Sequence, residues 1–181
     1  MRIAALLIAI QLFCIGSLSA KPNVLIFLVD DLGWTDLGYT GSKYYESPNI
    51  DALSRESIVF TNAYSNGPNC APTRACLMSG QYSPRHGIYT VGDPVRGNHK
   101  FRRWTPVENT TVLDDKVVTL AETFSNAGYS TVHLGKWHLG KDPTTQGFDL
   151  NYAGFTGGSP SKGGYHSPYA YPNVVEEKEG R

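Results

Sequence analysis

The sequence has no net charge, few cysteines and no internal repeat. Sixteen Lys and Arg residues balance sixteen Asp and Glu residues in 181 residues, so no overall field attracts nucleic acid or an anionic membrane surface. The composition does not indicate wholesale disorder either, because 40% hydrophobic and 12% aromatic residues are enough for the core of one domain. Function is therefore expected to reside in local sites.

The first residues form the longest apolar run of the chain. Met1 and Arg2 precede an almost wholly apolar stretch from Ile3 to Ile15, which is too short for a comfortable transmembrane span. Small residues at Ser17 and Ser19 suit a cleavage site. We expect residues 1–19 to be a signal peptide, and the chain to be exported (periplasmic, secreted or lysosomal, depending on the source) without stable membrane insertion after cleavage. The alternative is an uncleaved N-terminal anchor.

Cleavage would leave two cysteines, Cys70 and Cys76. They lie six residues apart at one predicted helix start, which is a poor placement for a disulfide. Cys76 is expected to be a small buried apolar residue. Pro72 favours a helix N-terminus at Cys70, where the exposed N–H groups and the charge of Arg74 suit a thiolate, a sulfate or a phosphate. The alternative is a buried cysteine with Arg74 in a surface ion pair.

Residues 23–29 are a continuous apolar run that ends at Asp30 and Asp31. Such a run is typical of a central parallel strand covered on both faces, and ligands gather at the carboxyl ends of such strands. Two adjacent carboxylates suit a hard cation such as calcium. The alternative is an acidic turn that caps the following segment.

The remaining pattern predicts an α/β fold with a mostly parallel central sheet flanked by helices. We expect a helix over residues 48–57 and a strand over 58–63, then a helix over 119–127 and a strand over 130–134. Lys136 and His138 follow this last strand and would point to the same side if the backbone stays extended. The alternative is a surface lysine and a packed histidine.

Two further segments have a distinctive composition. Residues 92–108 form a basic, proline-punctuated loop that can steer an anionic polymer by charge or be a solvated face; its basic residues are Arg96, His99, Lys100, Arg102 and Arg103. It is followed by a glycosylation sequon at Asn109. From Lys141 onward we expect no periodic element, and from about residue 154 the chain is rich in Gly, Ser, Pro and Tyr.

Three of these segments together resemble the type I sulfatases, the formylglycine-dependent, arylsulfatase-like branch of the alkaline phosphatase superfamily. Residues 70–74 (CAPTR) are similar to the C-x-P-x-R signature of that family, residues 22–33 to its opening strand with metal-binding aspartates, and residues 128–140 to its second signature. The resemblance covers about residues 22–155. It implies that residues 20–181 are the N-terminal portion of a sulfatase catalytic domain, truncated here, with an incomplete sheet.

The resemblance also implies roles for particular residues. Asp30, Asp31 and the formylglycine made from Cys70 would bind Ca²⁺, and Arg74 would support the modified residue. Lys136 would contact sulfate oxygens, and His138 the second hydroxyl of the aldehyde hydrate.

The implied function is a sulfuric ester hydrolase that acts on a sulfated small molecule or a sulfated carbohydrate and needs a formylglycine-generating maturation enzyme. The family's later metal ligands and leaving-group acid have no counterpart here, so we expect an inactive fragment. A phosphate or phosphonate ester hydrolase of the same superfamily and a non-catalytic remnant or binding protein are the alternatives.

Overall fold

The structure, a computed structural model, describes residues 21–160, 164–166, 169, 171 and 174. The chain divides into two compact units, residues 1–56 and 57–181. The predicted signal peptide of residues 1–19 lies outside the described residues. Among the residues that the structure describes, no helix has both the length and the apolar character needed to cross a membrane.

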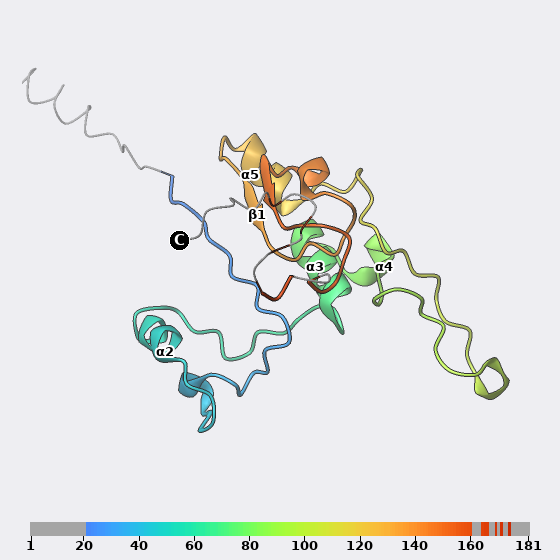
Figure 1. Ribbon diagram of the computed structural model, residues 1–181, viewed down its shortest axis with the longest axis horizontal. Coiled ribbons are helices and arrows are strands. Elements are labelled where there is room, and N and C mark those ends of the chain that lie inside the picture. The colour runs from blue at the N-terminus through green and yellow to red at the C-terminus, as the bar shows by residue number, and fades with distance from the viewer. Residues whose placement is uncertain (1–20, 161–163, 167–168, 170, 172–173, 175–181) are drawn as a thin grey trace, which may run out of the picture. The chain divides into compact units, whose positions relative to one another are not determined.

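The first unit contains the 3-10 helix η1 (Gly38–Thr40) and the helix α2 (Pro48–Arg55), which confirms the predicted helix over residues 48–57 (Figure 1). Ser47 precedes α2 without capping it through its side chain. Its hydroxyl instead accepts a hydrogen bond from Gly38 N–H at 2.8 Å and donates to Asp51 Oδ1 at 2.8 Å. Asp51 Oδ1 also accepts from Tyr39 N–H at 3.0 Å, so the polar groups of Ser47 and Asp51 hold η1 against α2.

The second unit begins its regular structure with helix α3 (Cys70–Ser79) and the short helix α4 (Ser83–His86). The N-terminus of α3 lies at Cys70, as predicted. The helix ends at Ser79 and is capped by Gly80, which has a φ of 64° and donates its N–H to Cys76 O at 2.9 Å. Glycine is favoured at such a left-handed position because it has no Cβ.

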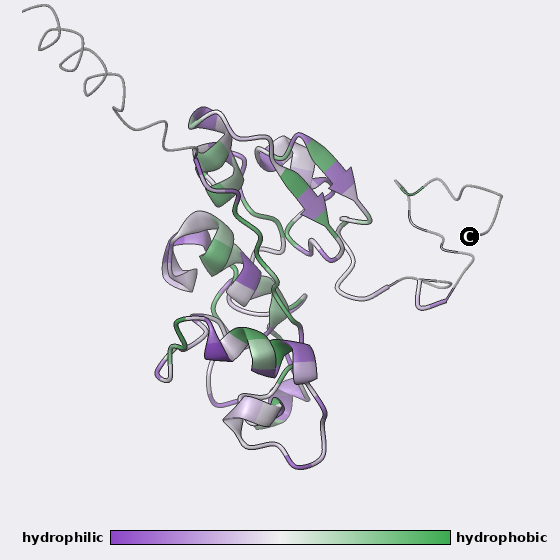
Figure 2. Cartoon of the chain, turned by 90° about the vertical axis from the view of Figure 1, so that its left-hand side faces the viewer, coloured by the Kyte–Doolittle hydropathy of each residue, from purple (hydrophilic) through white to green (hydrophobic). Residues whose placement is uncertain are grey.

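A helix and two parallel strands follow, and the helix and first strand match the predicted pair. Helix α5 (Leu120–Asn126) starts with a capping box in which Thr119 and Glu122 bond each other's backbone. Strand β1 (Val132–Leu134) leads through the 3-10 helix η3 (Pro143–Gln146) to β2 (Leu150–Tyr152), and the two strands pair in parallel with His133 opposite Asn151 (Figure 2). The architecture is thus a partial α/β fold, which confirms the predicted fold class.

The core of the second unit lies where α3 meets the segments around the sheet. Its fully buried apolar side chains come from α3, from the chain after α4 and from the loop after β1: Ala71, Ala75, Ile88, Leu113, Trp137 and Leu139. Lys136 and His138 alternate along the chain with Trp137 and Leu139. Because Trp137 and Leu139 are anchored in the core, the backbone that carries Lys136 and His138 is held in place.

Two predicted strands are wrong. Residues 23–29 and 58–63 adopt no strand, and Phe27 and Ile58 are 82% and 84% exposed. A strand exists only where a neighbour completes its ladder, and among the described residues the sheet consists of β1 and β2 alone. Conversely, η3 and β2 lie in the region after Lys141 where no element was expected, because elements of four and three residues are too short to show a period.

Candidate active site

Cys70 is the first residue of α3 and is half-buried, with a free thiol. The chain before it is packed tightly, since a Cβ on Gly67 would lie 2.4 Å from Thr73 N. Asn69, the residue before the cysteine, donates from Nδ2 to Thr90 Oγ1 at 3.2 Å. The thiol therefore lies at the N-terminus of a ten-residue helix, and the chain segment that leads into this helix is held by contacts of Gly67 and Asn69. Neither of the two free cysteines forms a disulfide, as the sequence predicted.

Arg74 joins two of the segments that the sequence singled out. Its Nη1 donates a hydrogen bond to the backbone carbonyl of Lys136, in the loop that follows β1. A positive charge one turn into α3 is thereby held against the chain segment that carries Lys136 and His138.

His133 is a site residue that the sequence reasoning missed, because it was treated only as a strand residue. It is 9% exposed and its ring packs edge-on against Trp137 at 5.3 Å and Phe148 at 5.2 Å. Burial, together with the positive charge of Arg74, lowers the pKa of His133 to about 4. At neutral pH this side chain is therefore an uncharged neighbour of the Arg74 guanidinium.

Lys136 and His138 were expected to point to the same side if the backbone after β1 stayed extended. The backbone there is not extended, so that condition is not met. His138 has a φ of 62°, and its N–H donates to Phe155 O at 3.1 Å. The imidazole lies against the backbone of Gly158, where a Cβ would come within 2.3 Å of His138 Cε1. Lys136 and His138 are nevertheless both half-buried, while Trp137 and Leu139 between and after them are buried.

Asp30 and Asp31 belong to the first unit of the chain. Cys70, Arg74, Lys136 and His138 belong to the second unit. Asp31 has a φ of 57°, and it is one of three described non-glycine residues with positive φ, together with His138 and Ala153. Non-glycine residues in this region are uncommon and cluster at functional sites. Two of the three positions here are residues that the family resemblance assigned.

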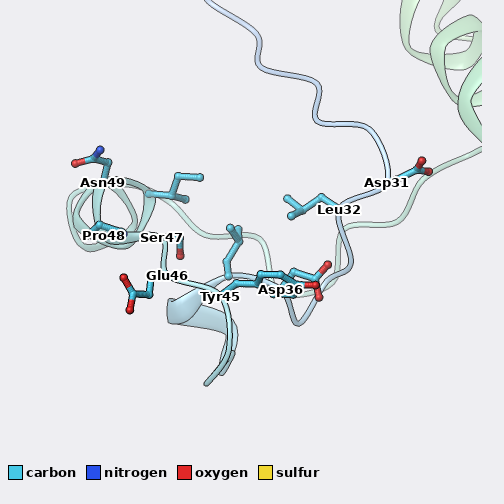
Figure 3. Close-up of a pocket in the computed structure, with 10 residues that line it drawn as sticks. Asp31, Leu32, Asp36, Tyr45, Glu46, Ser47, Pro48 and Asn49 are labelled. Atoms are coloured by element: carbon cyan, nitrogen blue, oxygen red, sulfur yellow. The ribbon is translucent and has the colours of Figure 1, made fainter. Parts of the chain in front are cut away.

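An open pocket in the first unit contains Asp31 with two further acidic residues, Asp36 and Glu46 (Figure 3). Figure 3 shows these three carboxylates pointing in different directions, and Asp36 Oδ2 accepts the N–H of Gly33 at 2.8 Å. In the part of the chain that the structure describes, no three His, Cys, Asp or Glu side chains converge as a metal site. The aspartates are suitable oxygen ligands, and they do not make a complete calcium site by themselves.

Cys76 is buried, as predicted, and has a polar neighbour that was not foreseen. His86 Nε2 lies 3.4 Å from Cys76 Sγ, while His86 Nδ1 accepts the N–H of Ile88 at 3.1 Å. Since Nδ1 is the acceptor, the neutral imidazole carries its proton on Nε2, directed at the sulfur. Burial lowers the pKa of His86, which favours this neutral form.

The comparisons with known proteins agree with the motifs. A family model described as Sulfatase matches residues 22–179. Human N-acetylgalactosamine-6-sulfatase is 38% identical over 160 residues, which is 84% of this chain and 28% of the human protein.

Two solved structures are also similar. The crystal structure of Ps i-CgsB in complex with k-i-k-neocarrahexaose is 34% identical with a TM-score of 0.56, covering 71% of this chain and 27% of that one. A structure described as a complex with its substrate D-glucosamine-2-N,6-O-disulfate is 28% identical with a TM-score of 0.56, covering 71% of this chain and 22% of that one.

Each of these matches covers only part of the related protein. The chain spans about a quarter of the length of these relatives, 28% of the human enzyme for example. The match to the family model nevertheless extends from residue 22 to residue 179 and includes all three motifs. The chain therefore belongs to the sulfatase family.

Proposed function

We propose that the protein hydrolyses sulfate esters at a site built on residue 70. The observation that carries this proposal is the hydrogen bond from Arg74 to the Lys136 carbonyl, because it brings two motif segments, 62 residues apart, to one place beside the Cys70 helix. A half-exposed free thiol at a helix N-terminus is open to modification and lies where an anion is stabilised. The names of the relatives, among them N-acetylgalactosamine-6-sulfatase, support the same reaction class.

The nucleophile we propose is formylglycine, made from Cys70 by a maturation enzyme. One hydroxyl of the hydrated aldehyde would attack the sulfur, and the bond from sulfur to the alcohol oxygen would break. Loss of the proton from the second hydroxyl would then re-form the aldehyde and release sulfate. Because Cys70 has no disulfide partner and is half-exposed, its environment is compatible with this modification. The surrounding side chains then have to bind the sulfate and neutralise the charge that develops on its oxygens.

Three side chains are proposed for that task. Arg74 supplies a fixed positive charge at the helix that carries residue 70, and Lys136 binds sulfate oxygens as a point charge. His138 contacts the second hydroxyl and accepts its proton at a ring nitrogen as sulfate leaves. Because the pKa of His133 is lowered to about 4, this histidine is uncharged at neutral pH and adds no further positive charge beside Arg74.

For the metal we propose that Asp30, Asp31 and residue 70 supply part of the ligand set of a Ca²⁺ ion. Calcium binds six to eight hard oxygen atoms and, when bound, would lower the pKa of a hydroxyl at residue 70. Two aspartates and one modified residue supply oxygen ligands of the right kind but fewer than the six to eight that calcium takes. We accordingly expect residues 1–181 alone to be inactive or nearly so.

The proposed substrate is a sulfated small molecule or a sulfated carbohydrate. One similar structure is described with a disulfated glucosamine as its substrate, and another contains a neocarrahexaose.

We also propose export through the signal peptide of residues 1–19. Phosphate or phosphonate ester hydrolysis is the alternative reaction, because a nucleophile among cations also suits phosphate; turnover of an aryl phosphate in preference to an aryl sulfate would favour it.

The test is the mass of the peptide that contains Cys70, after expression in a host that has a formylglycine-generating enzyme. Replacement of the thiol by an aldehyde, confirmed by reaction with a hydrazide probe, is the expected result. The Cys70→Ala variant is the negative control and should give no hydrazide product. An intact thiol in the wild-type chain would instead favour a non-catalytic remnant.

A further inference from the structure

The basic loop of residues 92–108, here named the basic arm, is a distinct structural feature of the second unit. It runs out from the end of α4 and returns, with the 3-10 helix η2 (His99–Phe101) near its tip (Figure 1). It contains four of the sixteen Lys and Arg residues and His99, against the two acidic residues Asp93 and Glu108. The charge that is balanced over the whole chain is thus locally positive here.

The two ends of the basic arm are fixed to each other by the Asn109 side chain. Its Oδ1 accepts the N–H groups of Tyr89 at 2.6 Å and Thr90 at 3.0 Å. Its Nδ2 donates to Thr90 O at 3.1 Å and to Gly92 O at 2.8 Å. All the hydrogen-bonding positions of one amide are therefore used to close the arm at its root.

The root lies directly beside the candidate nucleophile. Thr90, which Asn109 holds, also accepts the hydrogen bond from Asn69, the residue before Cys70. Ile88 is fully buried in the same core cluster as Ala71 and Ala75 of α3. The arm thus projects from a rigid base next to residue 70.

The tip of the basic arm is braced internally and presents its other side chains to solvent. Arg102 Nη2 donates to the carbonyls of Arg96 at 3.4 Å and Gly97 at 3.3 Å, so this guanidinium supports the backbone. Lys100 and Arg103 are exposed. Phe101 and Trp104, their neighbours in sequence, are 85% and 84% exposed.

We infer that the basic arm binds the sulfated carbohydrate chain that flanks the ester to be cleaved. The inference rests on the proposed sulfatase function for the choice of sulfated carbohydrate. Lys100 and Arg103 provide cations for sulfate groups, and the flat apolar face of the Trp104 indole suits the apolar face of a sugar ring. Phe101 and Trp104 each lie next in sequence to an exposed cation, so this surface offers a sulfated sugar both charge and an apolar face.

Binding would be measured by calorimetry with the 181-residue chain. The probes are hexasaccharides of chondroitin 6-sulfate and iota-carrageenan, their chemically desulfated forms, polyphosphate and single-stranded DNA. We expect a sulfated hexasaccharide to bind more tightly than its desulfated form and than the other two polyanions. Trp104→Ala should weaken its binding about ten-fold, and Arg103→Glu should weaken it several-fold and reduce the salt dependence.

Matched control variants lie outside the basic arm. Tyr44→Ala removes an aromatic side chain that is 86% exposed, and Lys116→Glu reverses an exposed charge. Both should bind the sulfated hexasaccharide as the wild-type chain does. Wild-type affinity in Trp104→Ala, tighter binding of DNA or polyphosphate, or no binding of either sulfated probe would overturn the inference.

This measurement is independent of turnover. Binding that depends on the arm, in a chain whose Cys70 remains a thiol, would support the arm and contradict the proposed chemistry. Conversion of Cys70 to the aldehyde, together with unchanged binding by the arm variants, would support the proposed chemistry and contradict the role of the basic arm.

Discussion

The burial of His133 predicts a specific loss of stability in acid. The side chain is 9% exposed and packs between Trp137 and Phe148, and its pKa falls from 6.5 to about 4 because of burial and the nearby Arg74 charge. Between these two pH values the unfolded chain binds a proton at His133 and the folded chain does not. The free energy of unfolding is therefore unaffected above pH 6.5 and decreases as the pH falls toward 4.

The size of this loss follows from the two pKa values. Each pKa unit corresponds to about 1.4 kcal/mol, so the fall from 6.5 to about 4 gives roughly 3 kcal/mol by the time the pH has dropped to 4. A small domain has only about 5–15 kcal/mol of stability in total, so the contribution should be easy to detect. It has the same sign as that of His86, whose pKa is also lowered by burial.

Urea denaturation between pH 7 and pH 4, followed by tryptophan fluorescence, measures the effect. The His133→Phe variant keeps a ring between Trp137 and Phe148 and cannot titrate, so its free energy of unfolding should fall by about 3 kcal/mol less than that of the wild-type chain over this range. A His99→Asn variant, changed at an exposed histidine, is the control and should follow the wild type. Equal acid sensitivity of His133→Phe and the wild-type chain would refute the reasoning.

Two other substitutions test contacts that hold the second unit together. Thr119→Val removes the hydroxyl that accepts from Glu122 N–H at 3.1 Å and donates to Gln146 O at 2.7 Å; it should lower the free energy of unfolding by about 1–2 kcal/mol, and Thr119→Ser should restore most of that loss. Asn109→Asp replaces both Nδ2 donors with an oxygen facing two carbonyls, so limited proteolysis should cut within residues 92–108 faster than in the wild-type chain. An unchanged cleavage rate would contradict the closing role of Asn109.

The sequence predicted the elements whose signals are local. Helix α3 was recognised from its first-turn proline, α2 from the Ser-Pro start, and α5 from its apolar face and the glycine that follows. These signals depend on residues within one or two turns of each other, which is why they could be read without a structure. The family motifs were likewise contiguous, and the match to the family model confirms the recognition they gave.

The errors concern features that depend on distant partners. An apolar run such as residues 23–29 has the composition of a strand, but a strand also needs a neighbour to complete its ladder. The reverse holds for β2, which forms because Thr131 and Asp149 bond each other across 18 residues. The lowered pKa of His133 likewise arises first from burial against Trp137 and Phe148 and then from the charge of Arg74 on another element, so no pattern around residue 133 indicated it.

The closed root of the basic arm also bears on the glycosylation sequon at Asn109. An N-linked glycan is attached through the side-chain nitrogen and leaves it with one hydrogen in place of two. Nδ2 at present satisfies two carbonyls, those of Thr90 and Gly92. A sugar at this position and the fully closed loop are therefore mutually exclusive, and a glycosylated chain would have one of these carbonyls without its bond to Asn109.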